Sequence, residues 1–307
     1  MSAEPTHSWL LVQLRAGSKC EEFLVHSVKP YVDTVMQTGM AESFSYVRHL
    51  SEPQSLRLYF KGPADVLQHI LQPNTFDYFH PLIGRKGVQA APYRPCLEMY
   101  GGITGHFLSM LQYRAASEMA LYQLDKHRAY WNRGKSLEIA RRLHSSLFFQ
   151  AGLTPLESAD LCQLMWTARR RNQSRPPSMA NQRRYRAQET LLAEQLGEYW
   201  HLQASQPVRD TQWQQWHSMN QIVSSSIQKN LALGKIKERA PRDLLLHGAR
   251  HNHGRIQWWS FLADFVCLMN NRLGILEAEE DYLLYSLAHS LRELTPPLDM
   301  NVTARAV

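Results

Sequence analysis

Short runs in which apolar and polar positions alternate dominate the first hundred residues of the chain. Such alternation is typical of strands, because successive side chains of a strand point to opposite faces of the sheet. Helical spacing occupies 18–37, interrupted at Pro30, and 63–71, where Val66, Ile70 and Leu71 are expected to point inward. The alternating or extended runs cover 9–14, 43–50, 55–60 and 88–100. Their order, β-α-β-β-α-β, predicts a ferredoxin-like sheet with helices on one face only.

The third of these strands has one apolar and one polar face. Leu56, Leu58 and Phe60 share the apolar face, whereas Arg57 and Tyr59 lie on the opposite one. The turn at 51–54 joins this strand to 43–50 in a hairpin. One interpretation is that this is the open face of the sheet and that its side chains form a polar patch that could act as a site. The other is that they belong to an ordinary solvated strand face. The patch would consist of Ser55, Arg57, Tyr59 and, from the neighbouring strand, Tyr46.

From His106 onward the apolar positions recur with helical spacing. Helices are predicted at 106–124, 127–149, 156–172, 182–203, 211–230, 255–273 and 277–293, with loops at 175–181 and 237–254. No internal repeat is expected. The fold class is therefore α+β: a sheet region, 1–104, is followed by a helical region, 105–307, and the two are expected to pack as one compact domain.

The composition is that of a folded protein that lies outside the membrane. The 307 residues are 44% hydrophobic and 20% charged, and no apolar run is long enough to cross a bilayer. Met1 to His7 lack the cationic and apolar regions of a secretion signal, so the protein is expected in the cytoplasm. The four cysteines contain no C-x-x-C pair and are expected to be reduced and buried.

The net charge of +7 suggests an acidic partner, and one segment concentrates the positive charge. Seven arginines fall within eighteen residues around a Pro-Pro loop: Arg169, Arg170, Arg171, Arg175, Arg183, Arg184 and Arg186. Three interpretations are open, namely a solvated surface, a nucleic-acid site or a site for an acidic peptide. Aromatic residues are sparse in the segment, with only Trp166 and Tyr185 nearby, which disfavours nucleic acid.

Two further segments could carry chemistry. Gly101 and Gly102 indicate a tight turn or a close backbone approach, and Glu98, Tyr100 and His106 surround them. Glu98 could act in catalysis or form a buried ion pair with Arg57. Three histidines, His247, His251 and His253, lie close together, but no carboxylate or cysteine accompanies them in a segment that looks like a loop. A metal site is therefore not expected.

The predicted helix at 255–273 shows two stripes. One is apolar and belongs to the core: Trp259, Leu262, Val266, Met269 and Leu273. The other is small and polar: Ser260, Asp264, Cys267 and Asn271. The second stripe is either a semi-exposed flank or part of a site. For Asn271 and Arg272, a structural role that ties this helix to the motif strands is the favoured interpretation.

Three motifs together resemble the C-terminal elimination domain of lantibiotic dehydratases. The strand type "F-x-R-Y", an acidic-Pro turn and "H-I-R-L-R-F" correspond to residues 46–60, YVRHLSEPQSLRLYF. The type "Y-x-x-E-x-x-R-Y-G-G" corresponds to 93–102, YRPCLEMYGG. The type "H-M-x-x-N-R-L-G" with a later glutamate corresponds to 267–274, CLMNNRLG, followed by Glu279 and Glu280. The motifs occur in the family's order and span most of the chain.

The chain departs from the family pattern at the residues that serve glutamate elimination. That family uses arginines to hold a glutamyl carboxylate and a histidine to transfer a proton. Two motif arginines are replaced here by Tyr59 and Met99, and the motif histidine by Cys267, so that only Arg57 is retained. A site without these guanidinium groups and this base is poorly suited to eliminating glutamate.

The departures resemble those of the stand-alone thiopeptide pyridine synthases, which join two dehydroalanines of one peptide by a formal [4+2] aza-cycloaddition. Loss of water and of the leader peptide then gives a pyridine. The resemblance implies a modified precursor peptide with an acidic leader as partner, no nucleic acid or membrane partner, and no cofactor or metal. The oligomeric state is open, with a homodimer among the alternatives.

The candidate catalytic residues are Arg57, Tyr59, Ser55, Tyr46, Glu98, Tyr100, Asp264, Cys267 and Asn271. The candidate leader-binding residues are Arg169, Arg170, Arg171, Arg183, Arg184 and Arg186. Two alternatives stay open: a glutamate-eliminating half-enzyme, and a non-catalytic peptide- or RNA-binding protein of the same fold. An open, aromatic-lined polar site at the motif strands would favour an enzyme, and a filled one would favour a binding protein.

Overall fold

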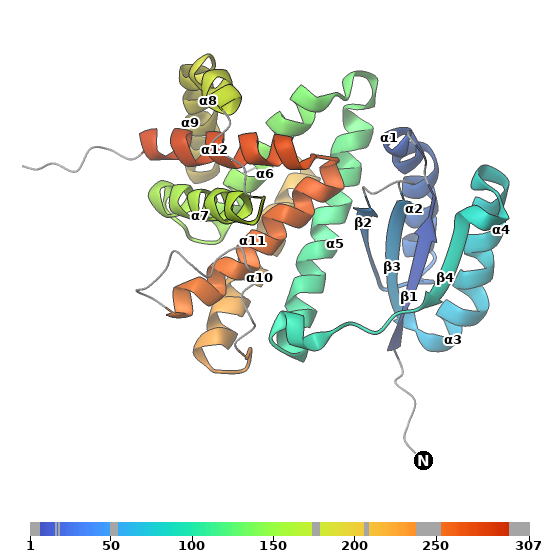
Figure 1. The fold of residues 1–307 in the computed structure, drawn as a ribbon. Coiled ribbons are helices and arrows are strands. Elements are labelled where there is room, and N and C mark those ends of the chain that lie inside the picture. Colours follow the sequence, from blue (N-terminus) through green and yellow to red (C-terminus); the bar gives the residue numbers. More distant parts are fainter. Residues whose placement is uncertain are drawn as a thin grey trace, which may run out of the picture.

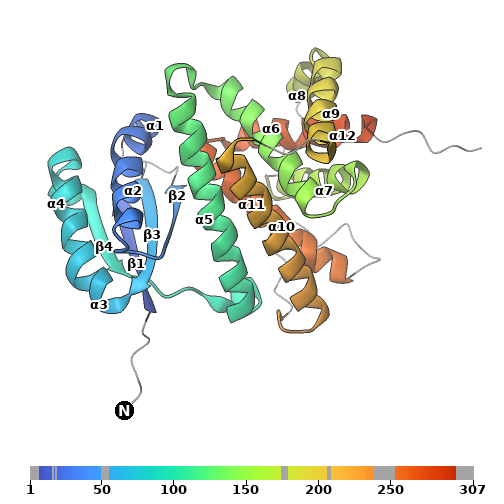
Figure 2. The ribbon, with the colours of Figure 1, turned by 180° about the vertical axis from the view of Figure 1, so that it is seen from behind.

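The computed structural model describes residues 7–15, 17, 19–49, 55–173, 179–205, 209–237 and 253–294. A small sheet with its own helices forms one side of the molecule, and a larger group of helices forms the other (Figure 1). The long helix α5, Ile103–Lys126, stands between the two parts in both views (Figure 2). None of the described helices is long and apolar enough to cross a membrane.

The sheet contains four strands in the order β2-β3-β1-β4, and every neighbouring pair is antiparallel. Their bounds are His7–Leu14 (β1), Ser43–His49 (β2), Ser55–Pro63 (β3) and Val88–Pro92 (β4). With the intervening helices this is the ferredoxin-like arrangement, so the predicted fold class is confirmed. The last strand is shorter than the extended run at 88–100 suggested, because Leu97–Tyr100 form a 3₁₀ turn.

One face of the sheet is covered by two helical stretches that both contain a π turn. The first runs through Cys20–Phe23 (α1), the π turn Leu24–Val28 and Lys29–Gln37 (α2). The second runs through Ala64–Val66 (α3), the π turn Leu67–Leu71 and Gln72–Ile83 (α4). The apolar strand residues, including Leu56, Leu58 and Phe60, are fully buried beneath them. Burial of this face therefore follows the alternation in the sequence.

Each π turn ends two residues before a proline, and the helix continues through that proline. Lys29 donates its N–H to the carbonyl of Leu24, five residues earlier, and Gln72 donates to Leu67 in the same way. The wider turn makes room for a proline ring that would otherwise clash with the carbonyl four residues before it. Both segments share the pattern Leu-x-His-x-(Val or Leu)-x-Pro, at 24–30 and 67–73, so the expectation of no internal repeat is wrong for this short stretch.

The continuing helices correct two predictions. The first helix is not interrupted at Pro30, and the second does not end at residue 71 but continues to Ile83. The shifted phase also changes which side chains point inward. Leu67 is buried, whereas Ile70 is 48% exposed, contrary to its expected inward position.

The helical part agrees closely with the predicted spans. Its helices are α5, Arg133–Gln150 (α6), Pro155–Gln173 (α7), Met179–Arg186 (α8), Glu189–Ser205 (α9), Thr211–Ala232 (α10), His253–Leu273 (α11) and Glu277–Glu293 (α12). The span predicted as one helix at 182–203 is divided into α8 and α9. Most of the predicted loop at 237–254 lies outside the described residues.

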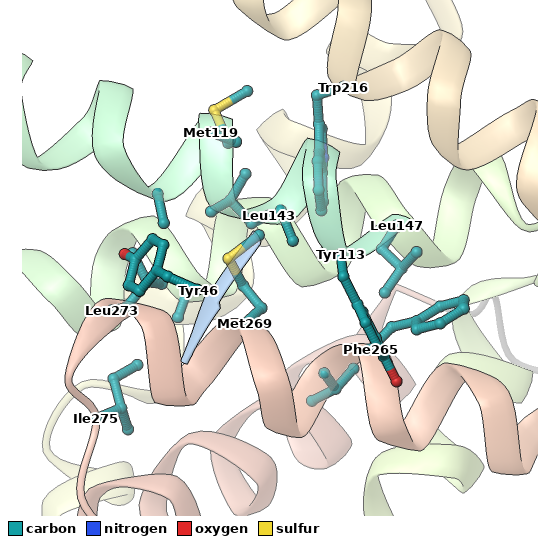
Figure 3. Packing of buried hydrophobic residues seen from close by; sticks show 14 of the residues in the cluster. Tyr46, Tyr113, Met119, Leu143, Leu147, Trp216, Phe265, Met269, Leu273 and Ile275 are labelled. Carbon is teal, nitrogen blue, oxygen red and sulfur yellow. The ribbon is translucent and has the colours of Figure 1, made fainter. Parts of the chain in front are cut away.

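Side chains from four helices form the core of this part, and one sheet residue reaches it. Figure 3 shows Tyr113, Met119, Leu143, Trp216 and Met269 of α5, α6, α10 and α11 packed around a common centre. Tyr46 of β2 lies beside Leu273 in the same view and is completely buried. The core of the helices is therefore continuous with the edge of the sheet.

Side chains of α5 and α11 form hydrogen bonds with backbone groups at the outer edge of β2. Asn271 accepts the N–H of Arg48 on its Oδ1 at 2.7 Å and donates its Nδ2 to the carbonyl of Arg48 at 2.8 Å. Ser117 Oγ accepts the N–H of Tyr46 at 3.1 Å. Asn271 thus substitutes for a neighbouring strand at an edge that would otherwise be unpaired. The expectation that this helix end is tied to the motif strands is confirmed.

Arg272 completes this junction from the other side. Its carbonyl accepts hydrogen bonds from Tyr46 Oη and Arg48 Nε, and its own Nε donates to Ser117 Oγ at 2.9 Å. Arg48 also pairs with Glu21, and Gly274 leaves room for that pair, since a Cβ there would lie 2.9 Å from Arg48 Nη1. The junction is therefore both hydrogen-bonded and closely packed.

We predict that Asn271→Ala destabilises the protein by roughly 1–3 kcal/mol, because it leaves the N–H and the carbonyl of Arg48 without partners. Thermal or urea unfolding measures the change. Asn74→Ala, at an exposed position of α4, is the matched control and should have little effect. Equal stability of the two variants would show that the junction contributes nothing to folding.

Candidate functional site

The sheet face opposite α1, α2 and α4 carries the polar side chains of the motif strands. Trp9 of β1 and Arg57 and Tyr59 of β3 lie on this face and are only half-buried. Residues that follow β4 come up beside them, including Tyr93 and Tyr100. These side chains are therefore partly accessible on the sheet face that α1, α2 and α4 leave uncovered.

A chain of aromatic rings crosses this face from β3 to α5. The ring centroids of Tyr59 and Tyr93 are 5.0 Å apart, and those of Tyr93 and Trp9 are 6.5 Å apart. Trp9 lies 5.8 Å from His106 in an edge-to-face arrangement, and His106 lies 5.0 Å from Tyr100. Such contacts fix the ring planes, so the imidazole of His106 is held between two aromatic neighbours.

Several polar atoms around these rings are buried without a hydrogen-bond partner. They include Arg57 Nε, His106 Nε2, Ser109 Oγ and Arg272 Nη1. Leaving such an atom unsatisfied costs roughly 1–3 kcal/mol, so water or a ligand is expected to serve it. The guanidinium of Arg272 lies 5.4 Å from the ring centroid of Tyr113, which continues the aromatic chain from Tyr100 at 6.5 Å.

Burial sets the protonation of the two basic groups. The pKa of His106 is lowered by its desolvation and, to a smaller extent, by the positive charge of Lys61, so the imidazole is neutral at pH 7. Burial lowers the pKa of Arg272 to about 10, which leaves that group charged. The site thus combines a neutral proton acceptor with a desolvated cation beside tyrosine hydroxyls.

A glycine turn positions Tyr100 and His106. Gly101 and Gly102 have positive φ angles of 70° and 106°, which other residues rarely adopt. A Cβ at Gly101 would lie 2.4 Å from the carbonyl oxygen of Lys237, and one at Gly105 would lie 1.8 Å from that of Tyr100. The predicted tight turn with a close backbone approach is confirmed, and no side chain fits at either contact.

Three further candidate catalytic residues, Tyr46, Glu98 and Ser55, lie in different environments. Tyr46 pairs with Leu58 in the sheet and therefore lies on the covered side, so its expected place in the polar patch is wrong. Glu98 is exposed, and the described residues contain no ion pair between it and Arg57, so the buried ion pair, one of the two alternatives for Glu98, is not formed. Ser55 does lie on the same face as Arg57, but it is buried at the start of β3.

The polar stripe of α11 is buried at Ser260 and Asp264 and half-buried at Cys267 and Asn271. Asp264 is only 4% exposed, and Asn271 is occupied by the backbone of Arg48. The pKa of Cys267 is raised well above its usual value by burial and then by the nearby Glu280, so its sulfur stays a thiol at neutral pH. A catalytic role for Cys267 as a base is therefore disfavoured, and the role of Asp264 stays a prediction.

Behind this stripe, a buried polar network ties α11 to three other helices. His144 of α6 and Asn270 are joined by a hydrogen bond of 2.7 Å, and Asn270 donates to Glu280 at 3.1 Å. Glu280 pairs with Arg169 at 2.8 Å, and Arg169 also pairs with Asp281 at 3.4 Å. The network fixes the helix that carries Asn271 and Arg272.

The arginine cluster consists of side chains in different environments. Arg169 is the half-buried partner of Glu280 and Asp281, so its expected place on a free leader-binding surface is wrong. Arg170 stacks 4.7 Å above Trp166 and Arg184 stacks 4.0 Å above Tyr282. Arg183 and Arg186 are exposed. Arg175 and the side chain of Arg171 lie outside the described residues.

Sequence reasoning missed several residues that define this face. Trp9, Tyr93 and Tyr113 were not singled out, and Arg272 was assigned a structural role only. Residues 9–14 form a mostly apolar run, so the local sequence pattern does not show which face of the sheet Trp9 occupies. Tyr113 and Arg272 come from helices distant in sequence, and no local pattern brings them to a strand face.

The described residues contain no group of three or more histidine, cysteine, aspartate or glutamate side chains that could hold a metal ion. Of the three clustered histidines, His247 and His251 lie outside the described residues, as does the side chain of His253.

Comparisons with known proteins fit this architecture. A family model, lantibiotic biosynthesis dehydratase C-term, matches residues 9–291. A search of curated proteins by sequence finds no match. The crystal structure of TsrL is 17% identical, with a TM-score of 0.69 over 94% of this chain and 95% of that chain. TbtD, a pyridine synthase from thiomuracin biosynthesis, is 13% identical, with a TM-score of 0.67 over 93% of this chain and 98% of that one.

The chain also resembles one part of a larger enzyme. The tRNA-dependent lantibiotic dehydratase MibB from Microbispora sp. 107891 is 17% identical, with a TM-score of 0.61. The match covers 95% of this chain but only 28% of MibB. At these identities the three structures establish the fold alone.

We predict that the buried histidine of the network makes the protein less stable in acid. The pKa of His144 is lowered by burial to about 4, against 6.5 for a free histidine. The unfolded chain therefore binds the proton first, and stability decreases as the pH falls from 6.5 towards 4, by about 3 kcal/mol in total.

Urea unfolding of the wild type and of His144→Gln across this pH range tests the prediction. The variant should show a smaller loss of unfolding free energy, and the exposed-site control His26→Gln should retain the wild-type slope. If the unfolding free energy of His144→Gln decreases with falling pH as steeply as that of the wild type, other groups cause the acid sensitivity.

Proposed function

The chain belongs to the family of lantibiotic biosynthesis dehydratase C-terminal domains, and on that basis we propose that it is a thiopeptide pyridine synthase. Membership makes it a homologue of enzymes that modify ribosomally made peptides. The proposed substrate is a linear precursor peptide that carries two dehydroalanines and an N-terminal leader. The proposed product is a pyridine-containing macrocycle, released together with water and the leader peptide.

The observation that carries this proposal is an aromatic site that lacks two of the arginines and the histidine with which family members bind and eliminate a glutamyl group. Tyr59 and Met99 replace two motif arginines, and Met99 is 49% exposed. Cys267 replaces the motif histidine and is held as a thiol by burial. Glutamate elimination needs carboxylate-binding cations and a base, so these substitutions favour a reaction on uncharged alkenes and amides.

The proposed cycloaddition depends mainly on holding two alkenes together. The amide that precedes one dehydroalanine passes its N–H proton to its carbonyl oxygen and becomes an iminol, which with the alkene forms a 2-azadiene. This azadiene adds across the second dehydroalanine, so one C–C bond forms between the two methylene carbons and another between the iminol carbon and the second α-carbon. Positioning alone can lower such a barrier by roughly 7–11 kcal/mol.

Two eliminations then make the ring aromatic without any oxidant. The hydroxyl on the former iminol carbon leaves as water, and the amide nitrogen on the second α-carbon leaves with the leader as a carboxamide. In each elimination, one ring carbon loses a proton and the leaving group gains one. The ring gains two double bonds in this way and becomes a pyridine.

The residues on the sheet face suit these proton transfers. His106, neutral and without a partner on Nε2, can take the amide proton and return it to a leaving group. Tyr59 and Tyr100 place hydroxyl-bearing rings at either end of the aromatic chain. Arg57 and Arg272 each offer an unpaired N–H for a developing oxyanion. The flat rings of Trp9 and Tyr93 can stack with the heterocycles of a thiazole-containing peptide.

Incubation with a leader-bearing, bis-dehydroalanine, thiazole-containing peptide tests the proposed function. Mass spectrometry should detect a macrocycle whose mass equals that of the substrate less water and the leader carboxamide, together with the free carboxamide. An unchanged peptide, with loss of glutamate from a glutamylated version instead, would show that the chain is an elimination enzyme.

We predict that His106→Gln lowers kcat by roughly 10²- to 10⁴-fold, because it removes a positioned proton-transfer group. Arg57→Ala and Tyr59→Phe should also impair turnover without unfolding the protein. The matched control is His69→Gln, at an exposed histidine on a π turn. Turnover equal to wild type in His106→Gln, with the fold intact, would place the proton transfer on another residue.

The exposed Arg183, Arg184 and Arg186, together with the half-buried Arg170, are proposed to bind the acidic leader. We predict that changing Arg170, Arg183, Arg184 and Arg186 together to glutamine raises KM and weakens leader binding, with a smaller effect on kcat, because the leader lies far from the reacting alkenes. Titration calorimetry with the isolated leader at low and high salt measures the change.

The matched control changes four exposed arginines elsewhere, Arg15, Arg85, Arg94 and Arg209, to glutamine. It removes the same net charge and should leave leader affinity nearly unchanged. Equal weakening in both quadruple variants would mean that only the overall charge of the protein matters.

A further inference from the structure

A cavity of about 490 Å³ lies where the end of the sheet meets the helices. It is bounded by the start of α1, the end of β2, the first residue of β3, the start of α6 and the turn between α11 and α12. It takes no part in the proton transfers proposed above. Its lining includes Arg48, Ser55, Arg128, Trp131 and Arg133.

The cavity wall includes a buried guanidinium that is not fully paired. Arg48 is 5% exposed; its Nε donates to the carbonyl of Arg272 and its Nη1 donates to Glu21. Its Nη2 is buried and has no hydrogen-bond partner. A desolvated guanidinium with one unused nitrogen is a strong donor to an anionic oxygen.

The start of α6 contributes a second source of positive potential. This helix has 18 residues, and Asn132 accepts the N–H of Lys135 as its N-cap. The remaining N–H groups of a first helical turn have no acceptor within the helix and attract anions. The cap residue and Arg133, which follows it, both line the cavity.

The residues that line the cavity carry more positive than negative charge. They include four cationic side chains, Lys19, Arg48, Arg128 and Arg133, and two acidic ones, Glu21 and Glu22. Arg128 and Arg133 pair with Asp125 at 3.9 Å and with Glu279 at 3.2 Å, but their side-chain exposures are 62% and 80%, so a bound carboxylate can compete for both of these surface pairs.

The remaining walls fit a peptide rather than a free inorganic ion. Trp131, Leu273 and Leu276 provide apolar surface beside the cations. Ser55 lines the cavity and shares a strand face with Arg57, two residues later and roughly 7 Å along the strand. A peptide bound across the aromatic face can therefore extend past Arg57 into this cavity.

We propose that this cavity binds a carboxylate of the substrate peptide. The carboxylate is received by Arg48 and the start of α6, while the adjoining chain packs against Trp131 and Leu276. This proposal rests on the proposed function only in taking a peptide as the substrate. Two carboxylates of such a peptide have the required chemistry: an acidic side chain of the leader and the C-terminal carboxylate of the core.

The test measures binding, so it does not depend on turnover. Fluorescence anisotropy would be recorded with three labelled peptides: the leader alone, a serine-containing core with a free C-terminus, and the same core with an amidated C-terminus. The proteins are the wild type, Arg128→Gln/Arg133→Gln, and the control Arg94→Gln/Arg209→Gln, which removes two exposed arginines outside the cavity.

The cavity variant is expected to weaken binding of the recognised peptide by roughly 3- to 10-fold, as for two partly exposed ion pairs, while the control stays near wild type. If the C-terminus is the recognised group, amidation weakens binding to the wild type and removes the difference between wild type and cavity variant. If the leader is recognised, the loss occurs with the leader peptide alone.

Equal affinity of the wild type and the cavity variant for the leader and the free-acid core would overturn the proposal. So would an equal loss in the control variant, which would indicate general charge attraction. If a peptide binds in this cavity but is not cyclised, the result supports the carboxylate site and refutes the proposed function.

Discussion

The architecture depends on how α11 closes the open edge of the sheet. Asn271 occupies the N–H and the carbonyl of Arg48 as a neighbouring strand would, and Arg272 directs its carbonyl and its side chain to the same junction. An unpaired edge strand would otherwise expose donors and acceptors that favour aggregation. Because the closing group is a side chain and not a backbone, the helix can lie beside the strand and bring its own residues to the sheet.

This junction explains why the candidate site is a composite of distant segments. The sheet supplies Trp9, Arg57 and Tyr59, and α5 supplies His106, but Arg272 reaches the same region only because its backbone is fixed on Arg48. The buried network of His144, Asn270, Glu280 and Arg169 holds α11 from behind. Unpaired polar atoms remain on the side that faces the aromatic rings, where a substrate could satisfy them.

The parts of this structure that could be predicted from the sequence are those set by local periodicity. The strand faces of β3 and nearly all helices follow from alternating or helical spacing, because burial of one face selects that spacing. The prolines led to wrong helix boundaries. A π turn allows a helix to continue through a proline, and the local sequence pattern does not reveal the π turn. The partners of Arg169 and the neighbours of His106 depend on packing between distant segments, which no local pattern encodes.

The replacement of the motif histidine by Cys267 has a physical consequence beyond the loss of a base. An imidazole in contact with Glu280 would form an ion pair, and the carboxylate would then compete for the proton that elimination requires. A thiol is small and uncharged, and burial keeps it so. Glu280 is instead neutralised by Arg169 and belongs to the structural network. In the proposed reaction, proton transfer is therefore assigned to His106, whose pKa is lowered by burial and whose Nε2 has no hydrogen-bond partner.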